Sequence, residues 1–93
     1  MSVLAVFRWE GDPDALLAAY DRELQHSVGR EQPRRVTHIC AQGENEVVIV
    51  DLWETEEDFR RMMENPEFLR NVEASGWPSE PIVKTYRVHA TIP

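Results

Sequence analysis

The sequence has one cysteine, three histidines and no long apolar run, and each shortage excludes a class of protein. Cys40 alone forms no internal disulfide, and three dispersed histidines do not make a structural zinc site. The longest apolar run near the N-terminus, residues 3–7, is too short for a signal-peptide core or a membrane span. Lys and Arg number 10 against 17 Asp and Glu, and the formal charge of −7 disfavours nucleic acid as a partner. We therefore expect a cytoplasmic protein that binds neither nucleic acid nor membranes.

The rest of the composition is that of an ordinary globular domain. Hydrophobic residues make up 42% and charged residues 29% of the 93 positions, which predicts a folded chain and not a disordered one. The length allows one domain, residues 1–93. A chain of 10.8 kDa should expose about 5,500 Å² when folded. Its core is therefore thin, and association with another chain would stabilise it.

Four segments have the β-branched and aromatic composition of strands: residues 3–9, 35–42, 47–53 and 82–92. The second and third are joined by residues 43–46, where Gly43 and Asn45 are expected to supply the positive φ of a tight hairpin. Helical periodicity fills the two remaining gaps. The order β-α-β-β-α-β predicts an α+β, ferredoxin-like fold with a four-stranded antiparallel sheet.

The first helix is expected to begin at the N-cap Asp12, with Pro13 in its first turn, and to end at Gly29 before a polar loop at residues 30–33. Its buried stripe is predicted to consist of the large residues at helical spacing, Leu16, Leu17, Tyr20, Leu24 and Val28.

The second helical region is expected to begin after the cap Thr55, with the i,i+4 pairs Glu56–Arg60 and Glu57–Arg61. The Asn65-Pro66 step should interrupt it. Its inward residues are predicted to be Phe59, Met62, Met63, Phe68, Leu69 and Val72. Gly76 suits a left-handed helix end, after which Trp77 is expected to pack on Val72.

Both faces of the central strands are apolar. In residues 47–53 one face carries Ile49 and Trp53, and the other carries Val48, Val50 and Leu52. Two helices cover only one face of such a sheet, so the other face needs a cover from outside the chain. We expect a homodimer packed sheet against sheet; an apolar surface for a different protein is the alternative.

Residues 51–59, Asp-Leu-Trp-Glu-Thr-Glu-Glu-Asp-Phe, followed by Asn-Pro-Glu-Phe at 65–68, resemble the strand-to-helix segment of the dimeric α+β barrel superfamily. The closest pattern is that of the antibiotic biosynthesis monooxygenase-like branch. Activities in this superfamily range from oxygenases and heme-degrading enzymes to isomerases, so the resemblance implies the dimeric barrel fold more firmly than any reaction. Heme-degrading relatives carry a histidine on the second helix and an asparagine in the first strand. Residues 55–75 lack histidine and residues 3–9 lack asparagine, so we do not expect heme.

The resemblance implies a pocket for an aromatic small molecule between the sheet and the second helix. Trp53 matches a pocket tryptophan of the family, and the walls around it would be Phe59, Met63 and Phe68. The alternative is that Trp53 is an ordinary core residue that closes the end of the sheet.

His38 and Asp51 are the candidate catalytic residues. If the hairpin loop has two or four residues, their side chains share a face of adjacent strands, whereas a three-residue loop separates them. A carboxylate beside an imidazole fixes its tautomer and raises its basicity, as a proton-abstracting base requires. Arg8 or Arg87 is the candidate stabiliser of a developing anion. The alternatives are a structural or solvent-facing pair for His38 and Asp51, and edge or interface charges for the two arginines.

Two functions of different classes remain open from the sequence. The first is a small-molecule enzyme that resembles cofactor-independent monooxygenases acting on phenolic or quinol-like substrates, or a related isomerase or lyase. It would need no cofactor and no metal. The second is a non-catalytic ligand-binding or assembly module with the same dimeric fold.

Overall fold

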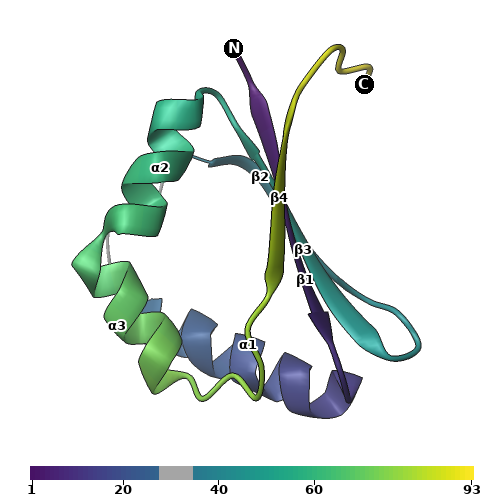
Figure 1. The fold of residues 1–93 in the computed structure, drawn as a ribbon, viewed down its shortest axis with the longest axis vertical. Helices are drawn as coiled ribbons and strands as arrows, with labels where there is room; N and C mark the ends of the chain where they lie inside the picture. The colour runs from purple at the N-terminus through teal and green to yellow at the C-terminus, as the bar shows by residue number, and fades with distance from the viewer. Residues whose placement is uncertain (28–34) are drawn as a thin grey trace.

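A computed structural model describes residues 1–27 and 35–93, and the elements follow the predicted order. Strands β1 (Val3–Glu10), β2 (Arg35–Gln42), β3 (Glu46–Trp53) and β4 (Ile82–Arg87) form one antiparallel sheet in the order β2-β3-β1-β4. Helices α1 (Pro13–Ser27), α2 (Glu56–Glu64) and α3 (Pro66–Ala74) all lie on one side of the sheet (Figure 1). The predicted α+β, ferredoxin-like fold is confirmed.

Helix α1 begins as predicted, but its buried stripe differs. The Asp12 carboxylate accepts a hydrogen bond from the Asp14 backbone N–H at 3.2 Å, and the Asp12 carbonyl accepts one from Leu16 at 3.1 Å. Leu24 was expected to be buried and is 44% exposed, whereas Ala19 is fully buried. The buried stripe runs through positions 16, 19, 20 and 23, so Leu24 lies on its flank. The predicted Val28, Gly29 and loop at 30–33 lie outside the described residues.

Helices α2 and α3 each begin at the predicted cap, Thr55 and Asn65. The Thr55 hydroxyl accepts from the Asp58 backbone N–H at 3.1 Å, and the Asn65 side chain accepts from that of Glu67 at 2.9 Å. The predicted ion pairs Glu56–Arg60 and Glu57–Arg61 measure 3.2 and 2.7 Å.

The predicted burial of Leu69 is wrong, because its side chain is 48% exposed. Helix α3 packs mainly against α1 and α2. It therefore buries a narrower stripe than the sequence pattern suggests.

Two predicted turns have different outcomes. Gly76 has a φ of +68°, as expected for the left-handed end of α3. The prediction of positive φ at Gly43 and Asn45 is wrong, because neither residue has it. The hairpin closes through a 2.8 Å hydrogen bond from the Gly43 N–H to the Glu46 carbonyl. The connection between the paired residues Gln42 and Val47 has four residues, and such a connection is usually built around a turn with negative φ angles.

Strand β4 is shorter than the predicted segment at residues 82–92. Its neighbour β1 begins at Val3, which pairs with Arg87, and the Val88 N–H donates to the Ser2 carbonyl as the last backbone bond between them. The strand pairing between β1 and β4 therefore ends at Arg87.

The two faces of the sheet differ in burial. On the face under the helices, which we call the covered face, the side chains of β1 and β3 alternate into the core: Val3, Ala5, Phe7, Trp9, Val47, Ile49, Asp51 and Trp53. On the opposite, helix-free face, Ile39 and Ile82 are 53% and 48% exposed. The chain exposes 6603 Å², roughly 1,000 Å² more than expected for a compact monomer of this mass.

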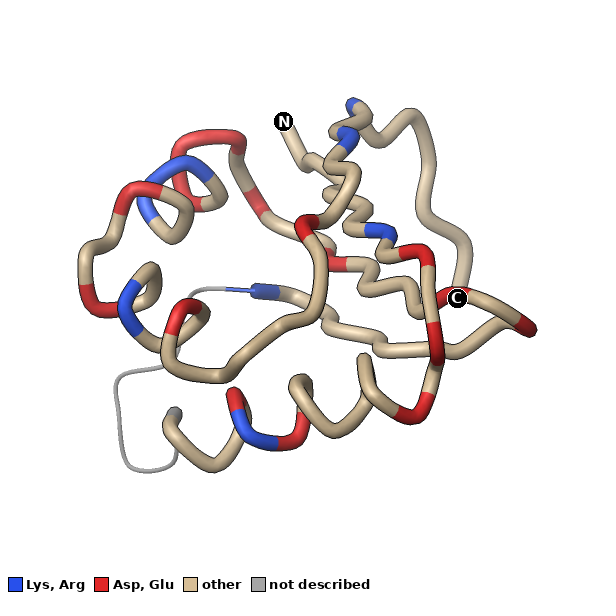
Figure 2. Tube along the Cα trace, turned by 60° about the horizontal axis from the view of Figure 1, so that its bottom comes forward, with Lys and Arg blue, Asp and Glu red and all other residues tan. Residues whose placement is uncertain are grey.

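The charges lie mainly away from the centre of the sheet. Figure 2 shows acidic positions spread along the helices and the connections between elements. Among the described residues, no helix is long and apolar enough to cross a membrane.

Candidate functional site

Polar side chains occupy one end of the covered face. The sheet register aligns Arg35, Trp53, Val3 and Arg87 in one row across the four strands, and His38, Asp51, Ala5 and Thr85 in the next. At the other end the side chains of β1 and β3 are apolar, with Phe7 beside Ile49 and Trp9 beside Val47. The charged groups of the covered face therefore lie in these two rows, which also contain Trp53.

His38 and Asp51 lie directly opposite each other on β2 and β3. The register pairs Gln42 with Val47 across the four residues 43–46. A connection of four residues puts the side chains of His38 and Asp51 on the same face, as predicted from the sequence for a loop of this length. His38 Nδ1 and Asp51 Oδ1 are 2.5 Å apart, and the Asp51 side chain is only 2% exposed. A buried carboxylate needs such a partner, because burial without one costs several kcal/mol.

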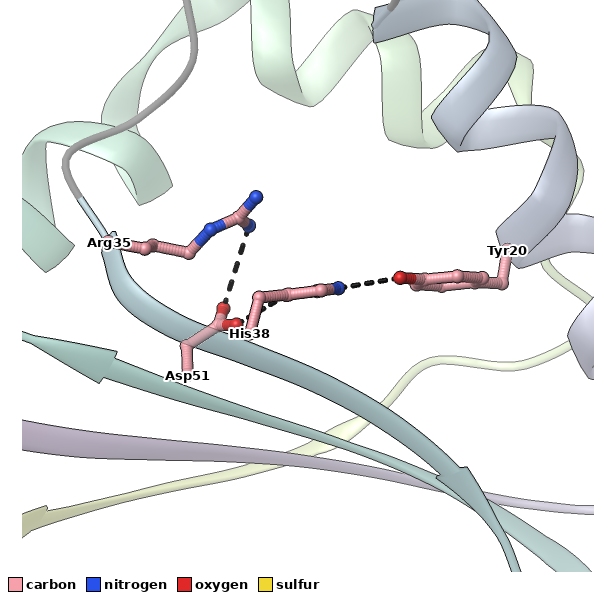
Figure 3. A network of polar contacts seen from close by, with 4 residues as sticks. All are labelled: Tyr20, Arg35, His38 and Asp51. Atoms are coloured by element: carbon pink, nitrogen blue, oxygen red, sulfur yellow. Dashed lines mark hydrogen bonds and ion pairs between the residues drawn. The ribbon is translucent and has the colours of Figure 1, made fainter. Parts of the chain in front are cut away.

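Tyr20 and Arg35 complete the group. The Tyr20 hydroxyl, on α1, lies 2.6 Å from His38 Nε2, and the Arg35 guanidinium lies 3.9 Å from the second oxygen of Asp51. Figure 3 shows these four side chains on the side of the sheet that faces α1. We call Tyr20, Arg35, His38 and Asp51 the polar cluster.

Neither Tyr20 nor Arg35 was predicted from the sequence as a site residue. Arg35 and His38 are three positions apart, so in a regular strand they would point to opposite faces. A β-bulge between Arg35 and Thr37 shifts the register and puts both on the covered face. For Tyr20 a signal was present, since a tyrosine in a buried stripe needs a partner for its hydroxyl.

The electrostatics of the polar cluster favour one arrangement of protons. The ionised Asp51 carboxylate only accepts hydrogen bonds, so a neutral His38 ring carries its proton on Nδ1 and accepts from the Tyr20 hydroxyl at Nε2. Burial raises the pKa of Tyr20, and the nearby Cys40 adds to this effect. Burial also raises the pKa of the Cys40 thiol. Both groups are therefore protonated and neutral at neutral pH.

Trp53 is wholly buried, with an exposed fraction of 0%. Phe59 meets it edge to face, with ring centroids 6.0 Å apart. Met63 and Phe68 are partly buried against the same core. The indole N–H of Trp53 has no hydrogen-bond partner among the described residues. The four predicted pocket residues therefore belong to one cluster, and that cluster is closed around Trp53.

The two arginines expected to stabilise an anion lie away from the polar cluster. Arg8 is on the helix-free side, where it pairs with Glu10 at 2.9 Å and with Glu46 at 3.1 Å. Arg87 lines a cleft of about 500 Å³ together with Val3, Glu56, Thr85 and Tyr86. Three strand spacings separate β4 from β2, roughly 14 Å. Arg35 is therefore the guanidinium that this site offers.

No group of three His, Cys, Asp or Glu side chains that could hold a metal ion occurs among residues 1–27 and 35–93.

Comparison with solved structures identifies the fold. SnoaB from Streptomyces nogalater, a cofactor-independent oxygenase, superposes with a TM-score of 0.75 at 24% identity over 99% of this chain and 97% of its own. The monooxygenase of ActVA-Orf6 from Streptomyces coelicolor, solved with the ligand nanaomycin D, gives 0.70 at 18% identity over 99% and 91%. Rv0793 from Mycobacterium tuberculosis gives 0.73 at 12% identity over the whole of both chains.

The same fold occurs in putative antibiotic biosynthesis monooxygenases, such as the one from Chloroflexus aurantiacus with a TM-score of 0.73 at 9% identity over 100% of this chain and 98% of its own, which confirms the fold that the sequence resemblance implied. No protein-family model and no curated protein matches the chain.

Proposed function

We propose that the protein is a small-molecule enzyme that oxidises phenolic or quinol-like substrates with O₂ and without a cofactor. The observation that carries the proposal is the buried Asp51 carboxylate held 2.5 Å from His38, because that pair forms a base whose tautomer is fixed. The fold shared with SnoaB and with the ActVA-Orf6 monooxygenase supports the reaction class.

The reaction begins with removal of a proton from the substrate hydroxyl by the His38–Asp51 pair. The phenolate passes an electron to O₂, and the resulting superoxide joins the ring carbon para to the hydroxyl. The abstracted proton returns to the peroxide and gives a hydroperoxide. The hydroperoxide then eliminates water, which includes the hydrogen of that ring carbon, and a para-quinone remains. One phenol and one O₂ thus give one quinone and one water. Arg35, beside Asp51, adds positive charge near the developing phenolate.

The test uses 1-naphthol, whose para position is free, in buffer containing a metal chelator. We expect the protein to consume one O₂ for each 1,4-naphthoquinone formed, and His38→Gln to slow this by about 10²-fold or more, as for loss of a general base. The oxygen electrode and quinone absorbance report the two quantities. A panel of phenols and hydroquinones that gives no O₂ consumption above the rate without protein would remove the proposal.

The second candidate function is a non-catalytic ligand-binding or assembly module, and the closed packing around Trp53 favours it. Under either function we place an aromatic ligand against Trp53, whose indole N–H has no partner in the part of the chain that the structure describes and can donate to a ligand. Such a ligand must first displace Phe59, Met63 or Phe68. Tryptophan fluorescence and melting temperature with the same phenol panel test this, and Trp53→Phe should weaken binding. Binding without turnover selects the module, and no quenching with no thermal shift excludes a ligand site at Trp53.

We also propose that the protein is a homodimer joined through the helix-free face. Seven apolar side chains of that face lie on adjacent strands: Leu4, Val6, Ile39, Val48, Val50, Leu52 and Ile82. Its acidic sheet residues, Glu10 and Glu46, lie at one end and pair with Arg8. Two acidic chains can therefore meet there without opposing carboxylates. The extra exposed surface of roughly 1,000 Å² matches what one partner buries in a standard interface, about 800 Å².

Sedimentation at micromolar concentration tests the dimer. We expect twice the 10.8 kDa chain mass. Val50→Asp should give monomer or aggregate, since the interface would bury an unpaired charge at several kcal/mol. Glu57→Lys, on the exposed surface of α2, is a charge-changing control that should remain dimeric. A monomeric wild-type protein would refute the homodimer but would not contradict the proposed role of His38.

A further inference from the structure

His38 does not present a free nitrogen to a substrate. Its Nδ1 is held by Asp51 and its Nε2 lies 2.6 Å from the Tyr20 hydroxyl, so both ring nitrogens are engaged. The polar cluster is thus a chain of hydrogen bonds that starts at a buried carboxylate and ends at a phenol on α1. Figure 3 shows the chain running from β3 through β2 to the helix.

We propose that Tyr20 is the catalytic residue that contacts the substrate hydroxyl, and that His38 acts through it. This inference rests on the proposed function and names the group that carries it out. The Tyr20 oxygen accepts the substrate proton while its own proton passes to His38 Nε2. The imidazolium formed is stabilised by Asp51, and reversal of the two transfers returns the proton to the peroxide intermediate. Protons are conserved at each step, and O₂ remains the only oxidant.

The geometry of Tyr20 suits this role. The planes of the Tyr20 and His38 rings differ by 8°, with centroids 5.8 Å apart, so the hydroxyl meets the nitrogen near the plane of the imidazole. A hydroxyl that donates one hydrogen bond keeps lone pairs for a second group. Tyr20 is only partly buried, whereas the Asp51 side chain is 2% exposed, so Tyr20 is the more accessible of the two.

The surroundings keep Tyr20 neutral between turnovers. Besides His38 and Asp51, the ionisable groups that act on it are Glu23 from its own helix and Arg35 and Cys40 from β2. Because burial raises the pKa of Tyr20, the phenol stays protonated at neutral pH before a substrate binds. A neutral hydroxyl also binds a phenol without charge repulsion.

The first experiment separates the relay from oxidation by excluding oxygen. 4-Nitrophenol is titrated anaerobically at neutral pH, where both of its forms are present in solution and only the ionised form is yellow. We expect the wild-type protein to bind it with a raised ionised fraction, and Tyr20→Phe and His38→Gln each to abolish that rise. The control Tyr86→Phe removes the other phenol of the chain and should change nothing, and melting temperatures verify that each variant is folded.

The outcomes separate the two proposals. If Tyr20→Phe still ionises 4-nitrophenol and only His38→Gln fails, His38 contacts the ligand directly; the relay is then wrong and the proposed function stands. If wild type ionises 4-nitrophenol through Tyr20 but never consumes O₂ with 1-naphthol, the relay stands and oxidation is wrong. Absence of any 4-nitrophenol binding to wild type overturns the relay.

A second experiment uses turnover of 1-naphthol. Tyr20→Phe and His38→Gln should each lower kcat/KM by about 10²-fold or more, and the double variant should be no slower than the slower single one, because the two residues act as one unit. Additive losses, or an unchanged rate in Tyr20→Phe, would show that Tyr20 is not part of the proton path.

Discussion

At one end of the covered face, Trp9 lies against Trp77 with ring centroids 4.2 Å apart and planes 12° from parallel; at the other end, Arg35, His38 and Asp51 are gathered beside Tyr20. The first group, which we call the tryptophan pair, buries apolar surface and stabilises the fold directly. The polar cluster must satisfy a buried charge and three polar groups before it stabilises anything. A domain of this size has little stability to spare, so a polar cluster placed in its thin core indicates function more than folding.

The comparison predicts that the tryptophan pair carries more stability than the polar cluster. Trp9→Ala should lower the free energy of unfolding by about 3–5 kcal/mol, through lost burial and the cavity left behind. Urea titration measures this from the shift of the midpoint. The control Arg60→Ala removes an exposed ion pair and should cost less than about 1 kcal/mol. A Trp9→Ala cost equal to that of the control would contradict the assignment of stability to the tryptophan pair.

For the polar cluster we expect a small effect on stability and a large effect on activity. Asp51→Asn keeps the volume and one acceptor but removes the charge that fixes the His38 tautomer, so we expect a loss of about 1–2 kcal/mol in stability. On the proposed function, oxidation of 1-naphthol should fall by about 10²-fold. Urea titration and the oxygen electrode give the two values on the same samples. A variant that unfolds readily but retains its rate would make Asp51 a structural residue.

Trp53 and Trp9 can be compared directly, because both indole N–H groups are buried without a partner among the described residues. Replacing each by Phe removes that unpaired donor, which offsets part of the lost burial. We expect Trp53→Phe to cost about 1 kcal/mol, and Trp9→Phe to cost more because it also weakens the contact with Trp77. Melting curves of the two variants compare them. A larger loss of stability in Trp53→Phe than in Trp9→Phe would mean that packing at the polar end contributes more to stability.

Much of the fold follows from local sequence patterns. The cap Thr55, the Asn65-Pro66 break and the left-handed Gly76 are determined by residues next to one another, and all three occur as predicted. The exposed Leu24 and Leu69 were misassigned because helical spacing shows which residues share a stripe but not how wide a stripe the neighbouring element covers.

The site was only half predictable for a different reason. Alternation along two strands was enough to place His38 opposite Asp51 once the hairpin length was known. Arg35 was missed because a one-residue bulge reverses its direction, and no residue type marks such a bulge in advance. Tyr20 was missed because the crossing of α1 over β2 is set by tertiary packing. The packing of Trp77 on Trp9 is likewise a long-range contact that the expected packing on Val72 did not anticipate.

The smallest expected effect concerns Glu23, which connects the tryptophan pair to α1. Its carboxylate accepts a 3.0 Å hydrogen bond from the Trp77 indole N–H, while burial raises its pKa above the ordinary 4.5. The folded state therefore binds a proton more readily than the unfolded state, so this group lowers stability as pH rises from 4.5 through the raised pKa.

Glu23→Gln keeps the acceptor for Trp77 and removes the charge. We expect it to raise the free energy of unfolding at pH 7 by about 0.5 kcal/mol, and to lose this advantage as the pH falls toward 4.5. Urea midpoints of variant and wild type across this range measure the effect, with Glu73→Gln, on exposed α3 surface, as the control. A variant less stable than wild type at pH 7 would mean that the charged hydrogen bond to Trp77 outweighs the cost of burying the carboxylate. The attachment of the tryptophan pair to α1 would then depend on the charge of Glu23, and not on ring stacking alone.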